Sequence, residues 1–186
     1  MNTFKSLTAD AVLQPLTVHE LIAEKIQAEL TELQSQNAPT AKEPSAVAFY
    51  KYSQVQLVTS TFFLMYGMLE DALYLECDGY NIKKNASILR FETALKDQGY
   101  DVTNQWWNTL LDLAKIRNCL LHGNGRLDTD RYGIETKNVI NALNCHSSAL
   151  LIEVIDVQGT TRIKLNNALL RYFYNAVVQF INVQNI

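Results

Sequence analysis

The longest uninterrupted periodic segment of the sequence, residues 45–77, most constrains the fold of this chain. It contains one glycine, Gly67, and no proline, so it has few of the residues that break a helix. Its larger apolar residues can lie along one broad helical face: Phe49, Tyr52, Val55, Tyr66, Leu69 and Leu73. We therefore expect a helix of about eight turns. Two facing antiparallel helix pairs would bury such stripes efficiently.

Shorter patterns predict the rest of the fold. A capping-box pattern, Thr17-Val18-His19-Glu20, predicts that the first helix begins at Thr17, continues to about Gln36 and leaves His19 exposed. Helical spacing indicates further helices over about residues 85–98, 103–123, 135–144 and 166–183. Two β-rich runs separated by Gln158-Gly159 predict a hairpin over residues 149–165. The expected fold is mostly α, a helical bundle of four to five core helices with this small β-hairpin inserted, in a single domain over residues 1–186.

Composition excludes several classes of protein. At 48% hydrophobic and 19% charged residues, the 186-residue chain has the balance of an ordinary globular domain. It has no apolar window of about 18 residues and no basic start followed by an apolar run, so neither a membrane helix nor a signal peptide is expected. The three cysteines, Cys77, Cys119 and Cys145, form no CxxC pair, and His146 lacks the spacing of a metal site or catalytic pair. We expect buried thiols, no metal, no cofactor and a cytoplasmic protein that does not bind membranes.

The net charge of −3 argues against a regulator that binds specific DNA sequences, because such domains are usually strongly basic. The charge says little against an enzyme that cuts structured RNA, which needs only a local patch. Six basic residues are candidates for such a rim: Lys83, Lys84, Arg90, Lys115, Arg126 and Arg131. The alternative is that these charges are scattered over loops and helices and are simply solvated.

The most informative segment contains Arg117, Asn118 and His122, near the end of the helix predicted over residues 103–123. Imidazole can accept and donate a proton near neutral pH. Guanidinium can bind a phosphate through two hydrogen bonds and stabilise charge that develops on its oxygens. In RNA the neighbouring 2′-hydroxyl can be the attacking group, so this chemistry requires no metal.

The helical spacing of these residues determines which of them can act together. Asn118 shares a helix face with His122, so it can orient the imidazole or bind a phosphate. Arg117 points about 100° away from Asn118 on a regular helix. Its convergence with His122 therefore needs a distorted helix end or a second copy of the chain. The inward stripe of this helix is expected to be Trp106, Leu110, Leu113, Ile116 and Leu120, with Gly123 as the left-handed residue after the helix.

Arg117-Asn118-x-x-x-His122 resembles the R-x(4–6)-H signature of the HEPN superfamily, in which a polar residue, often Asn, follows the arginine. The resemblance covers this motif and the helical layout from about residue 45 to His122, with the last helix added. The hairpin is not part of the family's minimal bundle. The resemblance implies a metal-independent endoribonuclease whose two motifs meet across a homodimer interface. It further implies RNA, tRNA included, as substrate, and a toxin with an antitoxin partner or a phage-defence protein.

Two adjacent carboxylates, Glu70 and Asp71, lie in an apolar part of the long helix. Carboxylates in such surroundings tend to need a partner. In several HEPN families an acidic residue of an earlier helix approaches the motif. By that resemblance Glu70 or Asp71 would fix Arg117 or raise the basicity of His122, and Glu70 is the supporting catalytic residue we expect. The alternative is that one of the two carboxylates faces solvent.

Two other functions remain open. The first is a non-catalytic HEPN-like module that binds a protein or a nucleotide, which the negative net charge and the lack of a basic stripe favour. The second is a structural helical protein in which the motif arose by chance. Copies of Arg117 and His122 facing one another across a dimer would favour the nuclease. Arg117 paired with a distant carboxylate, together with an apolar burial of His122, would favour the structural role.

Overall fold

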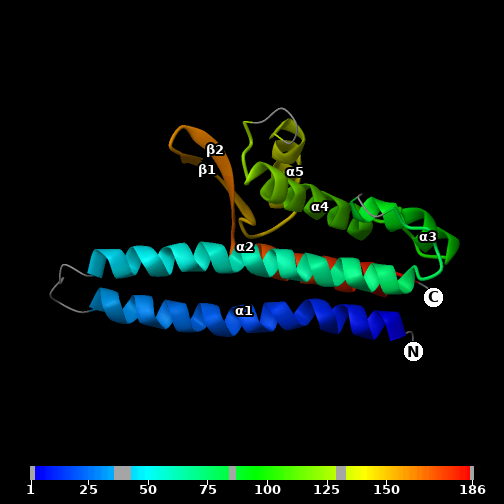
Figure 1. The fold of residues 1–186 in the computed structure, drawn as a ribbon, viewed down its shortest axis with the longest axis horizontal. Helices are drawn as coiled ribbons and strands as arrows, with labels where there is room; N and C mark the ends of the chain where they lie inside the picture. Colours follow the sequence, from blue (N-terminus) through cyan, green and yellow to red (C-terminus); the bar gives the residue numbers. More distant parts are fainter. Residues whose placement is uncertain (1–2, 36–42, 84–86, 129–132, 185–186) are drawn as a thin grey trace.

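The computed structural model describes residues 3–35, 43–83, 87–128 and 133–184. Along the chain they form α1 (Thr3–Ser35), α2 (Glu43–Glu76), the short 3₁₀ helix η1 (Ile88–Phe91), α3 (Glu92–Asp97), α4 (Gln105–Gly123), α5 (Gly133–Cys145), β1 (Ile152–Val157), β2 (Thr160–Leu165) and α6 (Asn167–Asn182). Figure 1 shows α1 and α2 as two long rods side by side, with α4, α5 and the hairpin on the other side of α2. The prediction of a mostly α fold with one small hairpin is confirmed.

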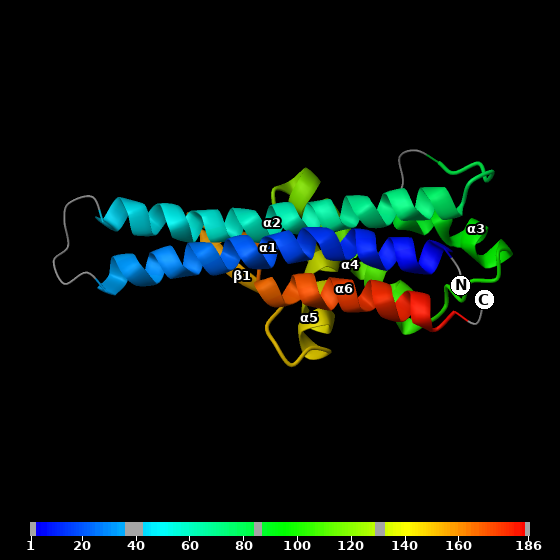
Figure 2. The ribbon, with the colours of Figure 1, turned by 90° about the horizontal axis from the view of Figure 1, so that it is seen from below.

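The long helix predicted over residues 45–77 is present as α2. Its buried side chains recur every three or four residues, at Val58, Phe62, Met65, Leu69 and Leu73. Phe49 and Tyr52, which the pattern placed on the same face, are exposed instead. The reason is their position, because the first turns of α2 extend with the end of α1 beyond the other elements (Figures 1 and 2).

The last helix, α6, packs one continuous apolar face against three other helices. Its buried residues form one continuous stripe: Leu169, Leu170, Phe173, Ala176, Val177, Phe180 and Ile181. Figure 2 shows α6 alongside α1, and it also contacts α2 and α4. The Phe173 ring lies 5.7 Å from that of Phe62 in α2, and the Phe180 ring lies 5.2 Å from that of Trp107 in α4. These tilted aromatic pairs join the end of the chain to its middle.

The predicted start of the first helix at Thr17 is wrong, because α1 begins at Thr3 and runs through Pro15. Thr17 caps nothing: its hydroxyl donates to the carbonyl of Leu13 one turn earlier, 3.1 Å away. A proline inside a helix costs about 3 kcal/mol, which propensity alone does not offset. Val12 and Leu16 are both buried in the core, and this packing carries the helix past the proline.

His19 is buried, with 3% of its surface exposed, so the prediction that it is exposed is wrong. Its Nδ1 lies 3.1 Å from the hydroxyl of Thr61 in α2, and its Nε2 lies 3.2 Å from Oδ1 of Asn167 in α6. The earlier start of α1 explains the difference, since residue 19 is then in mid-helix on the side that faces both neighbours. Burial lowers the pKa of His19, and the bond to Asn167 and the charge of Glu20 only partly oppose this effect.

The ends of α4 differ by one or two residues from the prediction. Asn104 is the N-cap, and its Oδ1 accepts hydrogen bonds from the backbone N–H groups of Trp106 and Trp107. Trp107, rather than Trp106, is the fully buried tryptophan. Gly123 is the last helical residue, and Asn124 follows it with φ of 50°. Asparagine tolerates this left-handed conformation, which leaves Gly123 within the helix that contains the motif.

The predicted hairpin is present, with Ile152 paired to Leu165 at one end and Val157 to Thr160 at the turn. Gln158 and Gly159 both have positive φ, 55° and 76°, as a two-residue turn between twisted strands requires. Asn144 of α5 anchors the start of β1. Its side-chain amide donates to the carbonyl of Ile152 at 2.9 Å, and its oxygen accepts from the N–H groups of Leu151 and Ile152.

Three smaller expectations have mixed outcomes. The helix predicted over residues 85–98 is found over Ile88–Asp97, beginning as 3₁₀, and Asn85 lies outside the described residues. Cys77 and Cys119 are buried as expected, but Cys145 is exposed because α5 ends there. Within the described residues, none of the helices combines the length and the apolar character that crossing a membrane needs.

The burial of His19 predicts a pH dependence of stability. The pKa of His19 is lower in the folded chain, so as pH falls below about 6.5 the unfolded chain takes up a proton first. We expect the free energy of unfolding, measured by urea denaturation, to decrease between about pH 7.5 and 5.5. His19→Gln should flatten this dependence, whereas replacement of the exposed His146 by Gln should not. An equal pH dependence in wild type and His19→Gln would contradict this assignment.

Candidate active site

The three motif residues lie on the second half of α4, which is α-helical from Gln105 to Gly123. Arg117 and Asn118 are half-buried, and His122 is exposed in the last turn. Five residues of a regular helix separate Arg117 and His122 by about 140° and about 7.5 Å along the axis. Because the helix is not distorted at its end, the guanidinium and the imidazole of one chain diverge.

Arg117 is held from α2 by the carboxylate predicted to approach it. Glu70 Oε2 lies 3.8 Å from Arg117 NH2, while Oε1 accepts a hydrogen bond from Arg90 NH2 at 3.0 Å. The side chains of Arg90, Glu70 and Arg117 are 8%, 19% and 28% exposed. Glu70 therefore lies between two guanidinium groups, and the more exposed of the two belongs to the motif. Asp71, the other candidate, faces solvent.

Two further contacts fix the Arg117 side chain. Arg117 NH1 donates to Oδ1 of Asn118 at 3.0 Å. The guanidinium carbon lies 5.6 Å from the ring centre of Tyr66, within the range of a cation–π contact. Burial, and then the charge of Glu70, raise the pKa of the Tyr66 phenol, so this ring stays neutral. Arg117 is thus oriented by α2 on one side and by its own helix on the other.

Half of the six candidates for a basic rim contact carboxylates. Arg90, with 8% of its side chain exposed, contacts the rings of Tyr74 and Phe91 and pairs with Glu70. Two other cations also contact carboxylates: Lys115 contacts Asp112 and Glu135, and Arg126 contacts Asp128. Lys83 is exposed, and Lys84 and Arg131 lie outside the described residues. The interpretation of these charges as a free basic rim does not hold for Arg90, Lys115 and Arg126.

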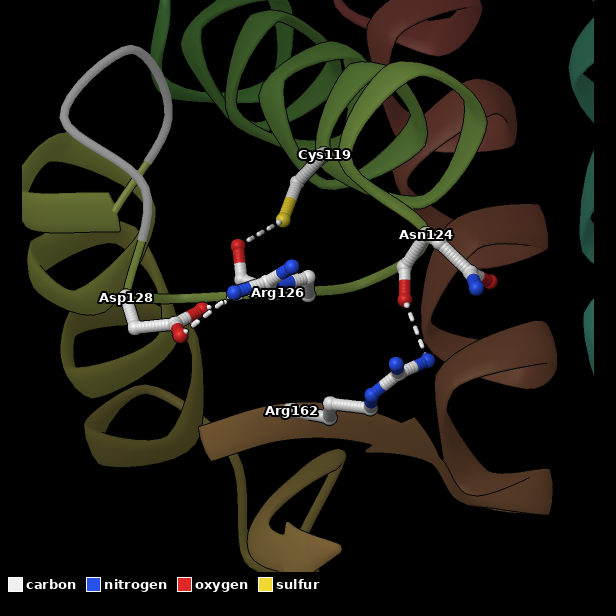
Figure 3. Close-up of polar contacts among 5 residues, drawn as sticks. All are labelled: Cys119, Asn124, Arg126, Asp128 and Arg162. Atoms are coloured by element: carbon white, nitrogen blue, oxygen red, sulfur yellow. Dashed lines mark hydrogen bonds and ion pairs between the residues drawn. The ribbon is translucent and has the colours of Figure 1, made fainter. Parts of the chain in front are cut away.

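Sequence reasoning missed one cation near the end of α4. Arg162 of β2 extends toward the C-cap of α4, where its NH1 lies 3.4 Å from the carbonyl oxygen of Asn124 (Figure 3). Asn124 is two residues beyond His122. No local pattern in β2 could have revealed this, because the two segments are far apart in the sequence and meet only in the folded chain.

Within the described residues, no group of three or more His, Cys, Asp or Glu side chains is placed to hold a metal ion. Comparisons of the chain with protein-family models, with curated proteins and with solved structures find no match. The resemblance to the HEPN superfamily therefore rests on the motif and on the helical layout.

The position of Glu70 between two cations predicts that loss of its charge lowers the free energy of unfolding more than loss of the charge of the neighbouring Asp71. Glu70→Gln removes the negative charge that contacts Arg90, whose side chain is only 8% exposed. We expect the free energy of unfolding to fall by about 1–3 kcal/mol, as for loss of a hydrogen bond to a charged group. Asp71→Asn, a change of the same kind at the exposed neighbour, should alter it by about 0.5 kcal/mol or less. Urea denaturation of both variants tests this, and equal effects would show that Glu70 has no special structural role.

Proposed function

We propose that this protein is a metal-independent endoribonuclease of the HEPN type that acts as a homodimer, in a toxin–antitoxin or phage-defence role. One observation chiefly supports the proposal. Arg117 is oriented by Glu70 and Asn118 yet keeps 28% of its side chain exposed, and the exposed His122 lies on the same helix. A phosphate clamp and a proton-transfer group are thus both accessible from solvent.

Each residue has a defined part in the proposed reaction. His122 removes the proton of the ribose 2′-hydroxyl or supplies one to the leaving 5′-oxygen. Arg117 binds the phosphate and stabilises the charge that builds up on its oxygens. Asn118 positions the Arg117 guanidinium, to which it is bonded, and Glu70 supports it from α2. The attacking oxygen belongs to the RNA, so the reaction yields a cyclic phosphate without a metal ion.

The divergence of Arg117 and His122 on one regular helix favours a site shared by two chains. A second copy of α4, facing the first, would bring the imidazole of one chain toward the guanidinium of the other. A dimer would also place two arginines and two histidines around one phosphate, which suits a reaction that needs both a base and an acid.

A non-catalytic binding module is the alternative, and one observation favours it. Arg90, Lys115 and Arg126 each contact a carboxylate, which lowers the positive charge available to attract a polyanion. The pairing of Arg117 with the sequence-distant Glu70 also fits a structural role. The exposure of His122 fits neither a buried structural histidine nor an apolar environment, and it is what favours the enzyme.

The first test is cleavage of total RNA and of tRNA by the purified protein in EDTA. We expect wild type to cut RNA and His122→Ala to be slower by about 10²–10⁴-fold, because general acid–base groups contribute about that much. His146→Ala removes another exposed histidine and should cut RNA at the wild-type rate. No cleavage by folded, dimeric wild-type protein would instead favour the binding module.

A second test addresses the shared site. We expect RNA cleavage per chain to fall when the protein is diluted into the range where sedimentation shows monomers, because one chain alone does not bring Arg117 and His122 together. Cleavage per chain that stays constant through that range would contradict a site at a dimer interface.

A further inference from the structure

The loop after α4 pairs with β2 through one isolated antiparallel bridge beside the two-stranded hairpin. The N–H of Leu127 donates to the carbonyl of Thr161 and the N–H of Ile163 donates to that of Gly125, both at 2.9 Å. Arg126 and Arg162 face each other between these two bonds. Side chains of directly opposed residues lie on the same face of an antiparallel pair, and like charges in that position repel.

The two guanidinium groups turn toward different partners (Figure 3). Arg126 forms a two-bond contact with Asp128, with Nε and NH2 at 3.0 and 2.8 Å from the carboxylate oxygens. Arg162 turns instead to the end of α4, where NH1 makes a long contact of 3.4 Å with the carbonyl of Asn124. The hairpin thus brings a positive charge to the helix end that contains His122.

Arg162 differs from the other arginines of the described chain in having no carboxylate oxygen within 4 Å, although, with the hydrogen bond from Arg126, its charge helps to lower the pKa of Asp128. Each of the others has such a contact: Arg90 and Arg117 contact Glu70, Arg126 contacts Asp128, and Arg171 contacts Glu20. In addition, the buried Nε of Arg162 has no hydrogen-bond partner among the described residues. Because this Nε is buried, an acceptor from outside the chain would reach the terminal nitrogens of the half-exposed Arg162, whose contact with Asn124 is long.

We propose that Arg162 binds a backbone phosphate of the RNA strand that is cut at Arg117 and His122, which makes the hairpin a second substrate-binding element. The inference rests on the proposed function, since it takes RNA as the ligand. A phosphate offers the anionic acceptors that a guanidinium binds best. Backbone contacts position a strand without reading its bases. Arg162 therefore contributes to RNA binding and not to proton transfer.

The test measures RNA binding and cleavage separately. Binding of labelled, unfractionated tRNA is measured over a range of salt concentrations with His122→Ala protein, in which cleavage of the probe is expected to be slower by about 10²–10⁴-fold. Adding Arg162→Gln should weaken binding about tenfold, as for loss of one charged hydrogen bond. It should also lower the slope of log affinity against log salt by about 0.7–0.9, the value for one phosphate contact. Adding Lys164→Gln is the matched control, because Lys164 lies on the same strand and face and is already paired with Glu153.

In the cleaving protein, Arg162→Gln should raise KM about tenfold and leave kcat nearly unchanged, and Arg162→Lys should recover part of the loss. Circular dichroism and the melting temperature of each variant separate this effect from misfolding. Equal effects of Arg162→Gln and Lys164→Gln on binding would overturn the inference about Arg162. A lower melting temperature of Arg162→Gln with unchanged KM and salt slope would also overturn it. Neither result would contradict the proposed nuclease activity. Arg162-dependent tRNA binding by a protein that cuts no RNA would instead support the RNA contact and refute the nuclease. Absence of RNA binding by wild type would overturn both.

Discussion

The packing of α6 is the constraint on which the rest of the bundle depends. This helix comes last in the chain, yet its apolar stripe contacts α1, α2 and α4. Phe173 meets the rings of Phe62 and Tyr66 in α2, and Phe180 meets Trp107 and Tyr100 at the start of α4 and just before it. Burial of an aromatic side chain contributes about 1.5–3 kcal/mol. Without this stripe, the apolar residues of α1 and α2 that pack on α6 would be exposed to water.

The position of the candidate site follows from which faces of α2 and α4 are buried and which are exposed. The side of α4 that carries Leu110, Leu113 and Ile116 is buried. Arg117 lies beside that face and contacts α2, and His122 in the last turn is exposed. On α2, Tyr66 and Glu70 are one turn apart, so the same helix supplies a buried ring and a carboxylate to one guanidinium. The orientation of the Arg117 side chain therefore depends on how the buried residues of α2 and α4 pack.

The basic residues near Arg117 and His122 are local exceptions in a chain whose net charge is negative. With a net charge of −3, the chain has no general attraction for a polyanion. Most of the cations near the motif contact carboxylates. Arg117 still keeps 28% of its side chain exposed, and Arg162 has no carboxylate oxygen within 4 Å among the described residues. They come from α4 and from the hairpin, elements that meet through the loop after α4.

The sequence by itself determined the features that depend on local periodicity and turn chemistry. These are the helices α2, α4 and α6, the hairpin with its Gln158-Gly159 turn, and the placement of Arg117, Asn118 and His122 at one helix end. Only the tertiary structure decided where α1 begins, because packing of Val12 and Leu16 outweighs the proline and the capping pattern. It likewise decided that His19 is buried, that Glu70 contacts Arg90 as well as Arg117, and that Arg162 lies at the end of α4. Each of these depends on contacts between residues far apart in the chain, which no local pattern encodes.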